Sequence, residues 1–180
     1  MTHVMIDLET LGTTSRSAWI SIGAVCFDPD TGVIDTGNAF YRNVDWDSAL
    51  RGREVSGDTL KWWMRQDPAA KDAVIHAGWP IEAVLTALSE WLPEGCVVWG
   101  NGSSFDISML EDTYHQYGVT VPWKFWNVRD VRTVVHLAQG LVERGSVPFE
   151  GTKHNALSDA IHQAKYVSAM WQALRGGANK

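Results

Sequence analysis

The sequence predicts an α/β fold in which helices flank a mixed sheet of five strands. Three apolar segments near the N-terminus are typical of antiparallel strands, and helical patterns then alternate with two short apolar segments. That order of elements favours a mixed sheet covered by helices. The chain has 180 residues, 45% of them hydrophobic, so we expect one compact domain over residues 1–180.

The N-terminal half begins with a predicted antiparallel meander. Its strands are expected at residues 4–9, 19–27 and 33–44. The sequence Asp-Pro-Asp-Thr-Gly at residues 28–32 is typical of a tight turn between the second and third strands. It lacks the later acidic ligand of a calcium-binding loop, so we interpret it as a hairpin turn.

Helical periodicity dominates the remainder of the chain. Apolar residues recur at helical spacing after Pro80, and Pro68 suits the first turn of an earlier helix. The predicted helices cover residues 59–66, 69–76, 81–92, 105–117, 131–141 and 156–174, and the two further strands cover residues 96–99 and 125–128.

Composition excludes several classes of protein. The net charge of −6 argues against a protein that coats nucleic acid by neutralising many phosphates. No apolar run approaches the roughly 20 residues that span a bilayer, and the N-terminus lacks the pattern of a signal peptide. Cys26 and Cys96 lie in apolar segments and are expected to be reduced core residues of a cytoplasmic protein with no membrane association.

The first predicted strand carries two acids. Alternate residues of a strand share a face, so Asp7 and Glu9 project together, opposite to Ile6 and Leu8. Two adjacent like charges are unfavourable unless a cation joins them. A solvated strand face is the ordinary alternative for so short a pattern.

Two further acids occur where predicted elements begin. Asp106 follows a strand and a glycine-containing loop and opens a helix, where an acid also simply complements the helix dipole. Asp159 lies in the first turns of the last helix, five residues after His154, and Asn155 is a plausible cap of that helix. A surface-loop position is the alternative for His154.

The four acids together indicate a metal site. The ends of elements can converge in a compact α/β domain, and Mg²⁺ prefers carboxylate and phosphate oxygens as ligands. Four carboxylates suit two ions about 3.5–4 Å apart that clamp the attacking and leaving oxygens of a phosphodiester. We therefore expect two Mg²⁺ ions, for which Mn²⁺ can substitute.

Three segments resemble the motifs of the DEDDh superfamily of 3′–5′ exonucleases. They are Met-Ile-Asp-Leu-Glu-Thr at residues 5–10, Asn-Gly-Ser-Ser-Phe-Asp at 101–106 and His-Asn-Ala-Leu-Ser-Asp at 154–159. Segments 21–25 and 59–67 further resemble the branch of phage exonucleases and RNase AS-type exoribonucleases. The resemblance runs almost end to end and implies the ribonuclease-H-like fold.

The resemblance also implies roles for particular residues. Asp7, Glu9, Asp106 and Asp159 would be metal ligands, and His154 would be the general base for the attacking water, releasing 5′-mononucleotides from single-stranded DNA or RNA 3′ ends. A neutral imidazole is a competent base near pH 7. The residues implied or suggested as substrate-binding are Thr10, Leu11, Phe105 and Trp63.

Several alternatives stay open at the level of the sequence. Adjacent helical residues point about 100° apart, so Trp62 and Trp63 cannot both face a substrate, and either one can belong to the core. Arg129 and Arg132 flank Asp130 and could meet phosphates or simply be solvated.

The same fold could also serve a ribonuclease-H-like endonuclease or a non-catalytic nucleic-acid-binding protein. The preference for DNA or RNA is undetermined, because no motif reports a contact to the 2′-hydroxyl. The family resemblance is compatible with a homodimer, and the ten tryptophans would suit its interface.

Overall fold

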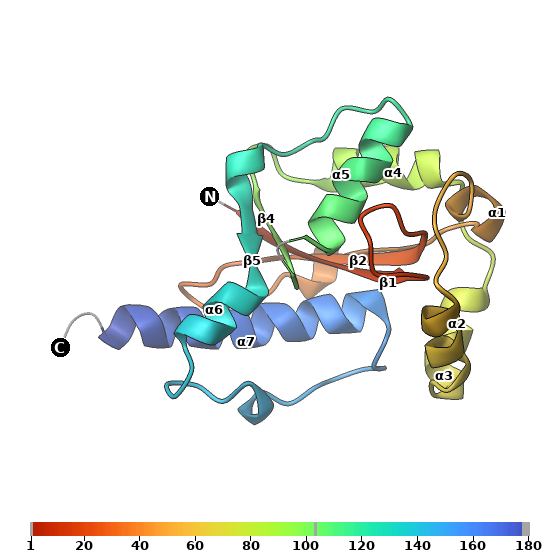
Figure 1. Ribbon diagram of the computed structural model, residues 1–180. Helices are drawn as coiled ribbons and strands as arrows, with labels where there is room; N and C mark the ends of the chain where they lie inside the picture. Colours follow the sequence, from red (N-terminus) through yellow and green to blue (C-terminus); the bar gives the residue numbers. More distant parts are fainter. Residues whose placement is uncertain (1, 103, 178–180) are drawn as a thin grey trace.

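A computed structural model describes residues 2–102 and 104–177 and shows a five-stranded mixed sheet in the order β3-β2-β1-β4-β5 (Figure 1). The strands are β1 (His3–Thr10), β2 (Trp19–Phe27), β3 (Phe40–Asn43), β4 (Val97–Gly100) and β5 (Val128–Asp130). The β1–β2 and β2–β3 pairs are antiparallel, whereas β1–β4 and β4–β5 are parallel. The predicted mixed sheet is confirmed.

Helices cover both faces of this sheet. They are α1 (Trp46–Ala49), α2 (Gly57–Met64), α3 (Pro68–Ile75), α4 (Ile81–Trp91), α5 (Asp106–Gln116), α6 (Val131–Leu137) and α7 (Ala156–Gly177). Figure 1 shows α4 and α5 on one face and α6 and α7 on the other. None of the described helices is long and apolar enough to cross a membrane.

The alternation along β1 divides the core into two clusters. Ile6 and Leu8 join the larger apolar cluster, together with buried residues of α4 and α5. Met5 points the other way and packs with buried residues of α6 and α7. Asp7 and Glu9 follow the parity of Met5, so they face α7, as the sequence pattern predicts.

Three expected elements differ from the structure. The third strand was expected over residues 33–44, but only Phe40–Asn43 pairs as β3, after a 3₁₀ turn at Thr36–Asn38. The expected strand 125–128 is a 3₁₀ turn, Phe125–Asn127, followed by β5. Phe125 and Trp126 in this turn are exposed, and aromatic residues are also common in strands, which explains the wrong prediction. The expected helix 131–141 ends at Leu137, just before a left-handed glycine, Gly140, with φ of +84°.

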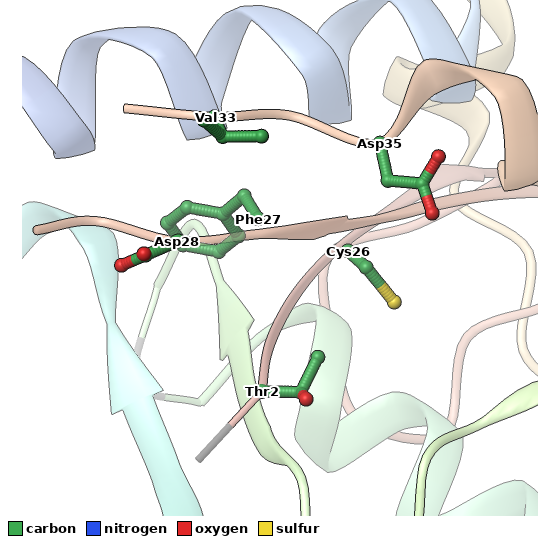
Figure 2. A pocket seen from close by; sticks show the side chains of 6 residues that line it. All are labelled: Thr2, Cys26, Phe27, Asp28, Val33 and Asp35. Carbon is green, nitrogen blue, oxygen red and sulfur yellow. The ribbon is translucent and has the colours of Figure 1, made fainter. Parts of the chain in front are cut away.

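A cavity lies at the end of the sheet opposite to the acids (Figure 2). It is lined by Thr2, Cys26, Phe27, Asp28, Val33 and Asp35. Both cysteines are free, as expected, and burial raises the pKa of the Cys26 thiol, which is therefore neutral at pH 7. This cavity offers no activated nucleophile.

Candidate active site

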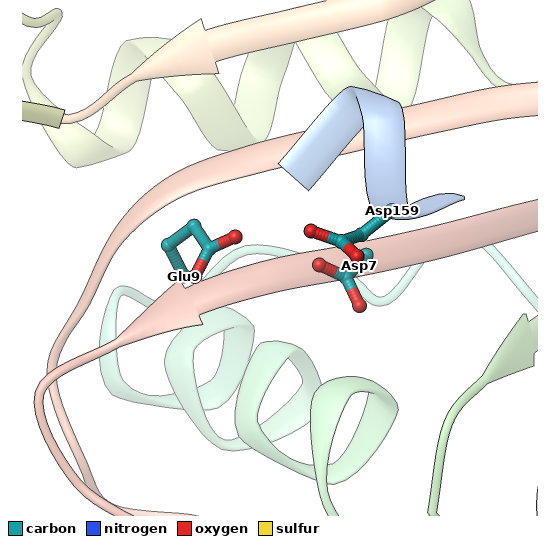
Figure 3. A group of neighbouring side chains, drawn as sticks. All are labelled: Asp7, Glu9 and Asp159. Atoms are coloured by element: carbon teal, nitrogen blue, oxygen red, sulfur yellow. The ribbon is translucent and has the colours of Figure 1, made fainter. Parts of the chain in front are cut away.

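Three carboxylates from two distant parts of the chain meet on the α7 face of the sheet. Asp7, Glu9 and Asp159 each place an oxygen so that these atoms all lie within 4.8 Å of one another. Figure 3 shows Asp159 extending from the start of α7 toward the two side chains of β1. The predicted convergence is confirmed for these three acids.

The start of α7 is set by a glycine in β2. Gly23 lies beside Asp7 in the β1–β2 register, and a Cβ at this position would come within 2.2 Å of the Leu157 nitrogen. The helix can therefore rest directly on the sheet only because this residue has no side chain. The Asn155 Oδ1 accepts a hydrogen bond from the Ser158 N–H at 3.1 Å, which confirms the predicted cap.

Asp106 lies beside the three-carboxylate group and is bound to the main chain. Its Oδ1 accepts a hydrogen bond from the Leu8 N–H at 3.2 Å, and its Oδ2 accepts one from the Asn101 N–H at 3.0 Å. Because Leu8 separates the two acids of β1, these bonds fix Asp106 next to them. The predicted helix-start position is also confirmed.

Burial raises the pKa of all four acids, and repulsion by the other carboxylates adds to this rise for Asp7 and Glu9. Burial, then the charges of Asp106 and Glu9, raise the pKa of Asp7 well above its usual value, although Gln163 donates to it. Burial and the charges of Asp159 and Asp106 raise the pKa of Glu9 to about 8. Burial raises the pKa of Asp106 to about 6 and also raises that of Asp159. Such a group is stable in ionised form only beside a cation.

His154 occupies a constrained position at the mouth of this group. Its φ is +60°, uncommon for a residue with a side chain, and its N–H donates a hydrogen bond to the Asp159 Oδ2 at 2.8 Å. The Trp62 ring stands edge-on to the imidazole, with centroids 4.8 Å apart. The main chain of His154 is thus bonded to one of the clustered carboxylates, which places the imidazole near them.

The residues proposed to bind substrate surround the end of β1. Thr10 and Leu11 are buried, and Phe105 is half-buried. Trp63 is only 7% exposed, and its Nε1–H donates to the Thr10 carbonyl at 2.8 Å. The suggested stacking role of Trp63 is therefore corrected: its ring belongs to the core, and the 40% exposed Trp62 is the ring beside His154.

Two supporting residues were missed in the sequence. Gln163 donates from Nε2 to the Asp7 Oδ1 at 2.7 Å, and its position one helical turn after Asp159 could have indicated it. Arg53 is buried, forms an ion pair with Asp112 and donates to three main-chain carbonyls, including those of Ser15 and Ser17. It thereby anchors the loop that follows β1. No local pattern marks such a residue.

The donor set fits hard divalent cations. Every candidate ligand is a carboxylate, which Mg²⁺ and Mn²⁺ prefer, and the pKa values of Asp7 and Glu9 are raised first by burial and then by the neighbouring carboxylates. Asp7, Glu9 and Asp159 could hold an ion directly, with Asp106 adjacent.

A five-stranded mixed sheet bearing clustered acids and a neighbouring histidine is the architecture of a ribonuclease-H-like nuclease. The nuclease domain of 3′hExo, described as a DEDDh family member bound to rAMP, has a TM-score of 0.65 at 15% identity and covers 95% of this chain and 92% of its own. Pop2p of S. pombe, in a Mg²⁺- and Mn²⁺-bound form, has a TM-score of 0.55 at 15% identity, covering 93% and 81%.

Residues 2–171 match the 3′–5′ exoribonuclease Rv2179c-like domain, and the chain belongs to that family. The exodeoxyribonuclease of Enterobacteria phage T4 is 26% identical, with 97% of this chain and 90% of the phage protein covered. The chain is a 3′–5′ exonuclease, as its motifs predict. Ser103, within the second motif, lies outside the described residues.

Proposed function

We propose that the protein hydrolyses the terminal phosphodiester of single-stranded nucleic acid 3′ ends and releases 5′-mononucleotides. Asp7, Glu9, Asp106 and Asp159 would hold two Mg²⁺ ions, and His154 would act as general base. The convergence of the buried Glu9 with the half-buried Asp7 and Asp159 on the α7 face is the observation that carries this proposal.

Bound divalent ions would neutralise phosphate charge and make water more acidic. The chain contributes three things around them. β1 and α7 fix the carboxylates, and the main-chain donors of Leu8 and Asn101 orient Asp106. The imidazole of His154 accepts the proton of the attacking water, and the hydrogen bond to Asp159 holds its loop in place.

The terminal nucleotide would lie between the end of β1 and the start of α5. Thr10 and Leu11 form one wall, and Phe105 forms the other. The wall at β1 is rigid, because the Thr10 hydroxyl donates to the Gly12 carbonyl at 2.8 Å and the Trp63 indole supports it from behind. A rigid pocket reduces the entropy lost on binding.

The relatives name both kinds of substrate. The family is described by an exoribonuclease, whereas the phage relative is an exodeoxyribonuclease. Incubation of matched 5′-labelled RNA and DNA strands with Mg²⁺, Mn²⁺ or EDTA shows whether the enzyme prefers ribonucleotides or deoxyribonucleotides. We expect progressive shortening from the 3′ end that EDTA abolishes. Internal cleavage of a strand with a blocked 3′ end would instead establish an endonuclease.

Replacement of His154 tests the proposed base. We expect His154→Ala to lower kcat by about 10²- to 10⁴-fold, the usual contribution of general acid–base catalysis, with little change in Mg²⁺ affinity. His115→Ala is the matched control, because that histidine is exposed on α5. A normal kcat in His154→Ala would assign the proton transfer to another group. The expected homodimer is checked separately by light scattering.

A further inference from the structure

The outer edge of the sheet carries exposed aromatic side chains and arginines without carboxylate partners among the described residues. β5 is the edge strand, with the Phe125–Asn127 turn before it and α6 after it (Figure 1). We call Phe125, Trp126, Arg129 and Arg132 the β5 track. They come from one short continuous segment that ends at the active-site side of the sheet.

The aromatic part of the track is unusually exposed. Phe125 is 79% exposed and Trp126 is 60% exposed. The two rings contact each other edge to face, with centroids 4.8 Å apart. Neither ring is counted in either apolar cluster of the described residues. Exposed rings beside cations are the usual platform for single-stranded nucleic acid.

The cationic part of the track is free of carboxylate partners. Within residues 2–102 and 104–177, neither Arg129 nor Arg132 forms an ion pair, whereas Arg53 and Arg175 do. The neighbouring Asp130 instead accepts hydrogen bonds from the N–H groups at the start of α6. Arg129 donates only to the main-chain carbonyls of Trp126 and Val128, so both guanidinium groups keep an uncompensated charge and further donors for phosphates.

Arg132 connects the track to the active site. Its Nε donates to the Asn101 Oδ1 at 3.4 Å, and the Asn101 N–H in turn donates to Asp106. It also lines a cavity of about 580 Å³ together with Phe105 and Thr13. The cavity therefore adjoins both the proposed nucleotide pocket and the track.

The chemistry of the reaction fixes the side on which the strand leaves. In an in-line displacement the attacking water and the leaving 3′-oxygen lie on opposite sides of the phosphorus. The loop of His154 reaches the carboxylates from the β2 side, because Leu157 rests on Gly23. The leaving 3′-oxygen belongs to the shortened strand, so that strand would lie toward β4 and β5, while the 5′-mononucleotide keeps the phosphate.

We propose that the 5′ part of the substrate strand runs along the β5 track, with Arg132 and Arg129 on its phosphates and Trp126 and Phe125 stacked on its bases. The track is a binding site for single-stranded nucleic acid outside the catalytic centre. This inference rests on the proposed function, because it assigns the His154 side to the attacking water.

The salt dependence of binding tests whether Arg129 and Arg132 contact phosphates of the substrate. Affinity for a labelled dodecanucleotide is measured against salt at fixed Mg²⁺ in a His154→Ala background, which slows turnover but keeps the carboxylates. We expect Arg132→Gln and Arg129→Gln each to reduce the slope of log K against log salt by about 0.7, the value for one single-strand phosphate contact. Arg175→Gln is the control, because Asp30 already pairs with Arg175. Unchanged slopes in both track variants would overturn the proposal.

A comparison of a long and a short substrate tests whether the aromatic rings bind bases; it uses variants that keep His154. We expect Trp126→Ala to raise KM for the dodecanucleotide roughly tenfold, as the loss of one stacked base does, and to leave hydrolysis of a trinucleotide unchanged. Trp79→Ala is the control, since Trp79 is 50% exposed outside the track and packs on Arg42. Equal effects on both lengths, or an altered association state with normal KM, would show that the rings serve the fold or a protein interface. Trinucleotide hydrolysis reports the proposed function independently.

Discussion

Replacement of Glu9 measures how far the acidic cluster lowers the free energy of unfolding in the absence of metal. We expect Glu9→Gln to abolish metal-dependent activity and, in the presence of a chelator, to stabilise the chain at pH 8. Folding raises the pKa of Glu9 from 4.5 to about 8, chiefly through burial and then through the charges of Asp159 and Asp106. Glu9 itself is only 7% exposed, so solvent screens this effect little.

The direction and size follow from proton linkage. Between pH 4.5 and about 8 the folded chain keeps a proton on Glu9 that the unfolded chain has released. Stability without metal therefore falls as the pH rises through this interval and levels off above it. At about 1.36 kcal/mol per pKa unit, the loss at pH 8 is about 4 kcal/mol. A neutral glutamine avoids this loss, which corresponds to a Tm about 10 °C higher for a chain of this size.

The assay is thermal or urea unfolding of both proteins in EDTA across this pH range. We expect the two stability curves to meet near pH 4.5, at the unfolded-state pKa, and to separate progressively up to pH 8. Saturating Mg²⁺ should stabilise the native chain much more than the variant and reduce the difference. Glu94→Gln is the control, since Glu94 is exposed. A Glu9→Gln protein that is less stable than the native chain at pH 8 in EDTA would refute the reasoning.

Three other variants test residues that position the active-site side chains. Gly23→Ala should displace the start of α7 at Leu157, destabilise the fold by about 1–3 kcal/mol and lower kcat; unaltered kcat would separate the helix contact from the catalytic geometry. Arg53→Ala should lower the free energy of unfolding in urea by about 2–4 kcal/mol, because it leaves the buried Ser17 and Met109 carbonyls without a donor; a loss below 1 kcal/mol would contradict its role as an anchor. Trp62→Ala should lower kcat while the Tm stays nearly constant, since the exposed ring contacts His154; a Tm loss without a kcat effect would make it structural.

The central part of the fold follows from local patterns in the sequence. β2 has the expected boundaries, because its apolar run is buried on both faces of the sheet. α4 is within one residue of its expected end, because its apolar positions repeat at helical spacing. The edges of the sheet were harder to predict. β3 and β5 are short, and the turns that precede them contain residues that also suit strands.

The acidic residues of the site were predictable for a different reason. The motifs around Asp7, Asp106 and Asp159 are short, and Asp106 and Asp159 lie in the first turns of helices, where they can meet an acid of the central strand β1. The supports were not predictable, since Arg53 and Gln163 act through contacts with residues far away in the chain. Long-range contacts of this kind leave no periodic signal.

The distinction between Trp62 and Trp63 shows how tertiary structure decides between equivalent residues. Both lie on α2, both are large and apolar, and the sequence indicates only that they point in different directions. The Thr10 carbonyl at the end of β1 accepts the indole N–H of Trp63, so that ring is drawn into the core. The same rotation of α2 turns Trp62 toward His154. The hydrogen bond that secures the wall of the nucleotide pocket therefore also sets which ring limits the movement of the proposed base.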